Sequence, residues 1–334
     1  MKKLIAILLV AAMALAMTAC GTINKTEVSV LWSGDGVVKI PNSLINAMER
    51  AMYIESISYK YYGANGDQAA QTKQAETALN AGCSALVVEL VDAAAAQTIL
   101  DLAKAKNVPV VFFNCEVEDA VIAGYDKCVA VETDADSVGA VQSEMIGKYV
   151  AENFKKLDRN GDGKLSYAPF GTADVTGIDA QLVAVIPQEP ASMAQILTTN
   201  NEESNNMVEL VITDSDATAL EVLADLQAVG FNDTRLTTHC IPLFTVGADA
   251  DASAFADTSS LKEEELAVFI YNTMNLVDAG KIAGVAMEDY DSIAIAVATV
   301  LRNLLKGNDI MQDVDQAAVA SPRRVSIDYT TYTG

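Results

Sequence analysis

Residues 84–114 read SALVVELVD, AAAAQTILDLAKAK and NVPVVFFN in succession, and this stretch decides the fold. The first and last segments contain apolar runs at 85–90 and 108–113, short enough for strands that are buried on both faces. The alanine- and leucine-rich segment between them, residues 93–106, predicts a helix. A buried strand, a helix and a second buried strand predict a parallel βαβ unit.

The same alternation continues on both sides of this unit. We expect strands at 28–32, 56–61, 85–90, 108–113, 128–131, 182–186, 208–213, 241–246, 282–287 and 324–329. We expect helices at 42–54, 67–80, 93–106, 137–156, 190–197, 216–229, 263–279 and 292–306. This pattern predicts an α/β fold with two doubly wound parallel-sheet lobes.

Three chain crossings should join the lobes, near residues 133–134, 287–289 and 322–323. The N-terminal lobe would then contain residues 27–133 and 289–321, and the C-terminal lobe residues 134–288 and 322–334. Ligands of open α/β sheets bind outside the carboxyl ends of the strands. Two such lobes facing one another predict a ligand cleft.

Composition excludes several classes of function. The 334-residue chain has a net charge of −23, which argues against binding nucleic acid and against steering of an anionic solute. His239 is the only histidine and has no base-orienting carboxylate at a fixed spacing, and no P-loop or G-x-G-x-x-G motif is present. We therefore do not expect an enzyme.

The N-terminus has a basic start, an apolar run and small residues before Cys20, which predicts an export signal over residues 1–20. We expect Cys20 to be acylated, with residues 21–26 as a tether and the lipid as the only membrane contact. The alternative is an ordinary secretory signal with an incidental cysteine. The remaining cysteines fit no zinc signature, and we expect free, mostly buried thiols at Cys83, Cys115, Cys128 and Cys240.

The loop at 158–166, DRNGDGKLS, matches the first two-thirds of an EF-hand calcium loop. Gly163 permits the sharp turn, but Pro169 occupies the position that should hold a bidentate Glu. The candidate oxygen ligands are the side chains of Asp158, Asn160 and Asp162 and the carbonyl of Lys164. The loop is either a solvated turn or a calcium site completed by a distant carboxylate.

Several stretches together point to one family. They are SALVVELVD (84–92), NVPVVFFN (107–114), YDKCVAVETDADSVGAVQSEMIGK (125–148), the loop at 158–166 and VELVITDSD (208–216). In these stretches the chain resembles the galactose/glucose-binding proteins, calcium-containing type I periplasmic sugar-binding proteins that serve ABC transporters. Weaker similarity extends over 241–248 and 278–289, so the resemblance covers most of the chain after the signal.

The resemblance implies a structural calcium ion. In that family the missing carboxylate comes from a Glu one residue into a later strand, the position of Glu209 in this chain. Ser166 stands where the family has a Gln, so that contact would be shorter and would need a water. The implied ligands of Ca²⁺ are Asp158, Asn160, Asp162, Lys164, Ser166 and Glu209.

The resemblance also implies a sugar site, at which this chain differs from the family. The residues at or near the family's sugar-binding positions are Trp32, Asp35, Asn114, Ser215, Asp249 and Glu288. The family's His-x-Asp-x-x-x-Arg cluster and its second stacking Trp are absent. Because Asp35 and Glu288 would repel a carboxylate, we expect a neutral or amino-bearing solute rather than a sugar acid.

We therefore expect a monomeric solute-binding lipoprotein in the periplasm or on the outer face of the cell membrane. It would capture a small sugar, galactose- or glucose-like, and deliver it to an ABC permease or a chemoreceptor. The alternative is the same fold with a decayed pocket, acting as a surface regulatory or interaction protein.

Overall fold

The computed structural model describes residues 27–35, 40–171, 182–184, 193, 196–197, 208–233, 240–256, 259, 262 and 271–334. These residues divide into two compact units: unit 1, residues 27–132 and 290–325, and unit 2, residues 133–289 and 326–334. The chain thus passes between units after residues 132, 289 and 325, whereas the sequence places these boundaries after 133, 288 and 321. The signal, the tether and Cys20 lie outside the described residues.

Unit 1 is built on a sheet with the strand order β11-β12-β5-β4-β3-β1-β2 among the described residues. Its strands are β1 (Glu27–Trp32), β2 (Ser58–Gly63), β3 (Leu86–Val88), β4 (Val110–Phe113), β5 (Cys128–Thr133), β11 (Val319–Ser321) and β12 (Arg324–Ile327). The strands from β1 to β5 pair in parallel. β11 and β12 pair antiparallel at one edge.

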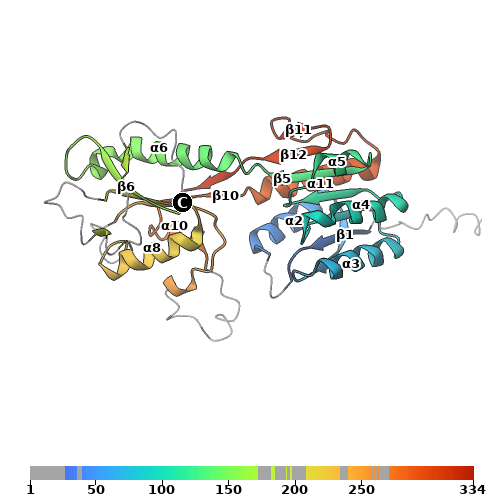
Figure 1. Cartoon of the computed structure of the whole chain (residues 1–334), viewed down its shortest axis with the longest axis horizontal. Helices are drawn as coiled ribbons and strands as arrows, with labels where there is room; N and C mark the ends of the chain where they lie inside the picture. Colours follow the sequence, from blue (N-terminus) through green and yellow to red (C-terminus); the bar gives the residue numbers. More distant parts are fainter. Residues whose placement is uncertain are drawn as a thin grey trace, which may run out of the picture. The chain divides into compact units, whose positions relative to one another are not determined.

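Helices cover both faces of this sheet (Figure 1). They are α2 (Asn42–Ile54), α3 (Gln68–Asn80), the short 3₁₀ helix η1 (Ala93–Ala95), α4 (Ala96–Ala105), α5 (Asp119–Ala123) and α11 (Tyr290–Lys306). Leu86, Val88, Val110 and Phe112 pack into the core beneath α3 and α4. Since side chains alternate along a strand, the intervening residues face the other side, where α11 packs against β4 and α2.

Unit 2 has a second sheet with the described order β13-β10-β9-β8-β6-β7. Its strands are β6 (Leu165–Phe170), β7 (Leu182–Ala184), β8 (Leu210–Thr213), β9 (Leu243–Val246), β10 (Gly284–Met287) and β13 (Thr330–Tyr332). The strands from β6 to β10 pair in parallel, and β13 pairs antiparallel with β10.

Three helices described in unit 2 pack on the two faces of its sheet: α6 (Ser137–Leu157), α8 (Asp216–Ala228) and α10 (Thr273–Asp278). From α6, Met145 and Ile146 pack on strand residues such as Leu165 and Phe244. The opposite core lies under α8 and α10. The prediction of two α/β lobes built on parallel sheets is therefore confirmed. A short 3₁₀ helix, η3 (Ser253–Phe255), follows β9.

Several element boundaries differ from the sequence-based expectations. The second strand begins at Ser58 rather than at residue 56. The sequence did not predict β6, β11, β13 or α5. Strand β6 was missed because its first residues resemble the end of a calcium loop and because Pro169 interrupts its pattern. Of the helix expected at 190–197, only residues 193 and 196–197 are described. Of the helix expected at 263–279, residues 263–270 lie outside the described residues, and the later part forms α10.

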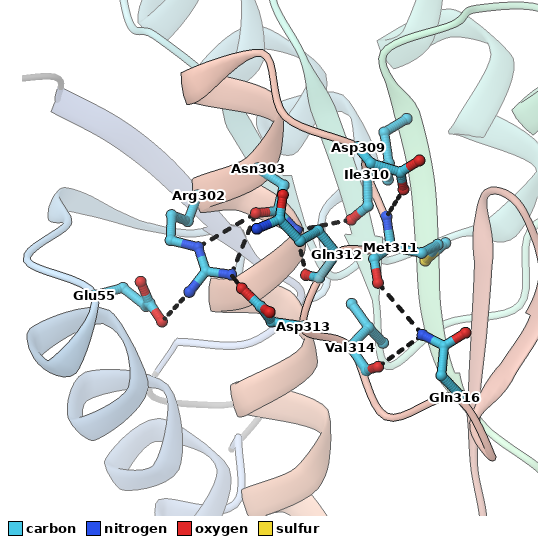
Figure 2. Close-up of polar contacts among 10 residues, drawn as sticks. All are labelled: Glu55, Arg302, Asn303, Asp309, Ile310, Met311, Gln312, Asp313, Val314 and Gln316. Atoms are coloured by element: carbon cyan, nitrogen blue, oxygen red, sulfur yellow. Dashed lines mark hydrogen bonds and ion pairs between the residues drawn. The ribbon is translucent and has the colours of Figure 1, made fainter.

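A polar network fixes the return of the chain from α11 towards the edge of the unit 1 sheet (Figure 2). Asn303 is fully buried, and its Nδ2 donates to the carbonyl of Ile310 at 3.0 Å. Arg302 forms ion pairs with Glu55 at 2.9 Å and with Asp313 at 3.0 Å. The turn that precedes β11 is thereby tied to both α11 and α2.

Two further arginines explain why unit 1 extends to residue 325. Nη1 of Arg323 donates to the carbonyl of Tyr125 at 2.9 Å. Arg324 forms ion pairs with Glu132 and, at 2.9 Å, with Asp119. All these partners belong to unit 1, so the third passage lies later than the sequence suggested.

Candidate functional site

Asn114 lies directly after β4, at the carboxyl edge of the unit 1 sheet. Its φ of 49° is in the left-handed region, which Asn tolerates better than most residues. Its backbone N–H donates to the carbonyl of Val131 in β5 at 3.0 Å. Its side-chain Nδ2 donates to Oε1 of Glu89 at 2.8 Å. The amide is thus held by two neighbouring parts of the sheet.

Glu89 follows β3 and lies at the centre of this arrangement. It is 6% exposed. Its Oε2 accepts from Ser33 twice, from the backbone N at 3.1 Å and from Oγ at 2.7 Å. Residues after β1, β3 and β4 therefore meet through one buried carboxylate. Glu89 was not among the site residues predicted from the sequence, although an acid inside the apolar run VVELV was the available signal.

Trp32 and Asp35 belong to the same edge of unit 1. Trp32 is 1% exposed and packs edge-on against Phe113, with ring centroids 5.1 Å apart. Its apolar ring therefore lies in the core of the unit instead of presenting a face to a sugar, as the sequence had suggested, and its Nε1 has no partner in the described residues. Asp35 lies over Gly63 at the end of β2, so closely that a Cβ on that glycine would collide with it.

The carboxylates of this edge affect a neighbouring phenol. The pKa of Tyr61 is raised by burial first and then by the negative charges of Asp35 and Glu89. Its ring stacks on Trp32 with centroids 6.1 Å apart. The carboxyl edge of unit 1 therefore combines two acids, an amide, a hydroxyl and an aromatic cluster.

In unit 2, Ser215 follows β8 and caps α8. Its Oγ accepts from the backbone N of Thr218 at 3.3 Å and lies 2.8 Å from Oγ1 of the same residue. Asp249 follows β9, and its backbone N donates to Oδ2 of Asp216 at 3.1 Å. In these contacts the Ser215 hydroxyl accepts from helix backbone and the Asp216 carboxylate accepts from loop backbone.

Glu288 follows β10, and its Oε1 accepts from Oγ1 of Thr133 at 3.2 Å. The pKa of Tyr329 is raised by burial first and then by the Glu288 carboxylate. The structure thus places Ser215, Asp249 and Glu288 after three strands of one parallel sheet, at the same edge.

The loop at 158–166 joins α6 to β6 and is closed by its own side chains. Oδ2 of Asp158 accepts from the N of Gly163 at 3.1 Å. Oδ1 of Asn160 accepts from the N of Asp162 at 3.0 Å, and Oδ1 of Asp162 accepts from the N of Lys164 at 2.8 Å. Gly163 has a φ of 77°, which explains the glycine at this position.

Pairing of β6 with β8 brings Glu209 to this loop. The carboxylate is 1% exposed, and its two oxygens accept from the N of Arg159 at 2.8 Å and the N of Ser166 at 2.9 Å. Burial raises the pKa of Glu209, and the hydrogen bonds from Ser166 and Arg159 oppose this shift. A residue 50 positions from Arg159 in the chain therefore lies against the loop.

The described residues contain no group of three or more His, Cys, Asp or Glu side chains arranged to hold a metal ion. The acidic side chains at the loop are instead directed at backbone amides. Among the same residues, no helix is both long enough and apolar enough to cross a bilayer.

A cavity in unit 1 lies away from all predicted site residues. It is lined by Asp126, the turn at 308–311, Val319 and residues 321–323. Asp126 lies before the start of β5, so the cavity is at the end of the sheet opposite Asn114. We assign no ligand to it.

Comparisons with known proteins agree with this architecture. The family described as "Periplasmic binding protein domain" matches residues 35–180. The D-galactose/methyl-galactoside binding periplasmic protein of Haemophilus influenzae is 26% identical over 304 residues, 85% of this chain and 82% of that protein.

Two solved structures share the fold. The chain covers 97% of a sugar-binding protein of a sugar ABC transporter from Bacillus halodurans, over 93% of its own length, with 14% identity and a TM-score of 0.54. A solute-binding protein from Actinobacillus succinogenes with bound D-allose gives a TM-score of 0.53 at 12% identity, covering 91% of this chain and 96% of that one.

These relatives are binding components of transporters and not enzymes, which agrees with the expectation from the sequence. The sequence match spans both units, and the structural matches reproduce the two α/β lobes. The chain is therefore similar in sequence to a periplasmic sugar-binding protein over most of its length, and it shares the two-lobed α/β fold of sugar-binding proteins of ABC transporters.

Proposed function

We propose that this protein captures a small sugar outside the cytoplasmic membrane and delivers it to an ABC permease or a chemoreceptor. The main support is the polar cluster of Ser33, Glu89 and Asn114, at the edge of a parallel sheet where α/β proteins bind ligands. Hydroxyl and amide groups both donate and accept hydrogen bonds, as sugar hydroxyls do.

The proposed solute is a neutral or amino-bearing sugar of galactose or glucose type. Asp35 and Glu89 place two carboxylates at the edge of unit 1, and Glu288 places one at the edge of unit 2. A sugar acid would be repelled by these groups, whereas an amino sugar would be attracted. In this proposal no aromatic face of Trp32 takes part, because the ring is in the core.

We also propose a structural Ca²⁺ ion at the loop. Calcium prefers hard oxygen ligands, which the side chains of Asp158, Asn160, Asp162 and Glu209 supply. The Lys164 carbonyl and Ser166, the latter through a water, would complete the proposed ligands. The buried Glu209 supports this proposal, because a carboxylate whose pKa is raised by burial gains most from a nearby cation. The ion would supply positive charge, while the chain's own residues shape the loop.

We propose that Cys20 is the acylated N-terminus of a lipoprotein, which would place a monomeric binding protein on the outer face of the cell membrane. Mass spectrometry of the membrane-associated protein tests this assignment. An unmodified Cys20 in the mature chain would contradict it.

The binding function is tested by a panel of neutral sugars, amino sugars and uronic acids, measured by thermal shift and calorimetry. A bound sugar stabilises the folded protein by mass action, so Tm should rise with sugar concentration. If no sugar of the panel binds, the alternative is favoured: the same fold serving as a regulatory or interaction protein.

A further inference from the structure

The buried carboxylate of Glu89 has both oxygens committed to protein donors. Oε1 accepts from Nδ2 of Asn114 at 2.8 Å, and Oε2 accepts from Oγ of Ser33 at 2.7 Å. An ionised carboxylate can only accept hydrogen bonds. Glu89 therefore determines how its two partners are oriented.

The orientation of Asn114 follows from this restriction. Its amide must turn Nδ2 towards Glu89, so that Oδ1 points away and accepts no hydrogen bond from a described residue. Ser33 is restricted in the same way, because its hydroxyl proton is directed to Glu89 and its oxygen lone pairs remain. At both positions acceptors outnumber donors among the groups left for a solute, because only the second N–H of the Asn114 amide remains as a donor.

We propose that Glu89 is a positioning residue that sets the solute specificity of unit 1. By holding Asn114 and Ser33 with their acceptors outward, it selects a solute group that donates several hydrogen bonds, such as an ammonium group, over a carboxylate or an ether oxygen. This inference rests on the proposed sugar-binding function and names the class of sugar, an amino sugar.

The test compares three sugars that differ at one group, D-galactose, D-galactosamine and D-galacturonate, together with their glucose counterparts. Calorimetry gives Kd for each sugar with wild type and with Glu89→Gln, which keeps the side-chain shape. We expect wild type to bind the amino sugar more tightly than the other sugars. In the variant, the ratio of Kd values that expresses this preference should fall about tenfold. Glu76→Gln, on the exposed face of α3, makes the same charge change as a matched control and should leave the preference intact.

A second variant separates orientation from simple stability. In Glu89→Gln/Asn114→Asp the hydrogen bond is reversed, since Gln can donate from Nε2 to the new carboxylate. The outward group at 114 is then again an acceptor, and the preference for the amino sugar should return. Ser33→Ala keeps the Glu89–Asn114 pair and removes one outward acceptor. The preference for the amino sugar should therefore fall about threefold.

An unchanged ratio of Kd values in Glu89→Gln, or a double variant that fails to recover the preference, would overturn this inference alone. If Glu89→Gln does not fold, the ratio of Kd values measured with Ser33→Ala tests the inference in its place. If wild type binds none of these sugars or others in the panel, the proposed function itself fails, and this inference with it.

Discussion

The carboxyl edges of the two sheets use their polar side chains differently. In unit 1, Glu89 joins Ser33 and Asn114 side chain to side chain. In unit 2, Ser215 caps a helix and Asp216 accepts from the backbone of the following loop. At the described edge of unit 2, Thr133 and Glu288 form a comparable contact between side chains. Ser33 and Asn114 in unit 1 keep acceptors beyond their bonds to Glu89, and we propose that this cluster sets the solute specificity.

The largest expected effect concerns the part of unit 2 with no counterpart in unit 1, the loop at 158–166. Glu209→Ala leaves the amides of Arg159 and Ser166 without an acceptor and removes a proposed calcium ligand. We expect Tm to fall by about 5–10 °C. Chelator should lower Tm in wild type and hardly at all in Glu209→Ala or Asp158→Ala.

Two controls accompany this experiment. Glu221→Ala, on the exposed side of α8, removes a carboxylate from the same unit and should keep the response to chelator. Glu209→Gln keeps one acceptor and removes the charge, so it should lose the response to chelator with a smaller fall in Tm. A wild-type melting curve that is indifferent to chelator would exclude the calcium site.

The second prediction tests the unit 1 edge directly. Asn114→Ala removes an amide that unit 1 offers to the solute, and it should weaken binding by about 1–3 kcal/mol. Tm should also fall, because Glu89 loses a donor and alanine tolerates a φ of 49° less well than asparagine does. Calorimetry with the best sugar of the panel measures the loss. Unchanged affinity, or tight binding of a uronic acid by wild type, would show that the solute lies elsewhere.

The sequence was informative where structure depends on local patterns. The helix at residues 42–54 was predicted with the bounds that the structure gives, and the buried runs of β3 and β4 decided the fold class. The prediction failed at β6, because Pro169 is unusual in a strand that pairs with a neighbour on each side, here β7 and β8. The β6–β8 pairing that places Glu209 beside the loop is long-range, and only the resemblance to a family suggested it.

The role of Glu89 could not be predicted for the same reason. Its partners Ser33 and Asn114 lie 56 and 25 residues away in the chain. They meet because β1, β3 and β4 are neighbours in the sheet, an order that local periodicity does not determine. Similarly, Trp32 looked available for a sugar, and only the three-dimensional packing with Phe113 shows that it is buried.

The third prediction asks whether unit 2 contributes to binding at its edge. Ser215→Ala removes the N-cap of α8, which should cost about 1 kcal/mol of stability. Because Oγ of Ser215 is engaged with Thr218, affinity for the sugar should change less than twofold, about 0.4 kcal/mol. A large loss of affinity with unchanged Tm would show that unit 2 shares the specificity that we assign to unit 1.

The smallest expected effect concerns the cysteine thiols, whose exposure differs between the two units. The described cysteines are free: Cys83 and Cys128 are buried in unit 1, Cys115 is half-buried there, and Cys240 of unit 2 is exposed. Burial raises the pKa of Cys115 and of Cys128 to about 12, so neither forms a reactive thiolate near pH 8. A thiol reagent should therefore modify Cys240 rapidly in the folded protein and the unit 1 thiols only after unfolding.

The pH dependence has a definite sign. The folded pKa values of Cys115 and Cys128 lie above the ordinary value of 9.0, so the unfolded chain loses these protons first. Their contribution to stability is complete below pH 9 and is lost as pH rises towards 12. Mass spectrometry after labelling at pH 8, with Cys240→Ser as control, identifies which thiols react. Modification of Cys128 as fast as Cys240 would mean that unit 1 opens readily, and a rigid arrangement of Glu89 and Asn114 could then not determine specificity.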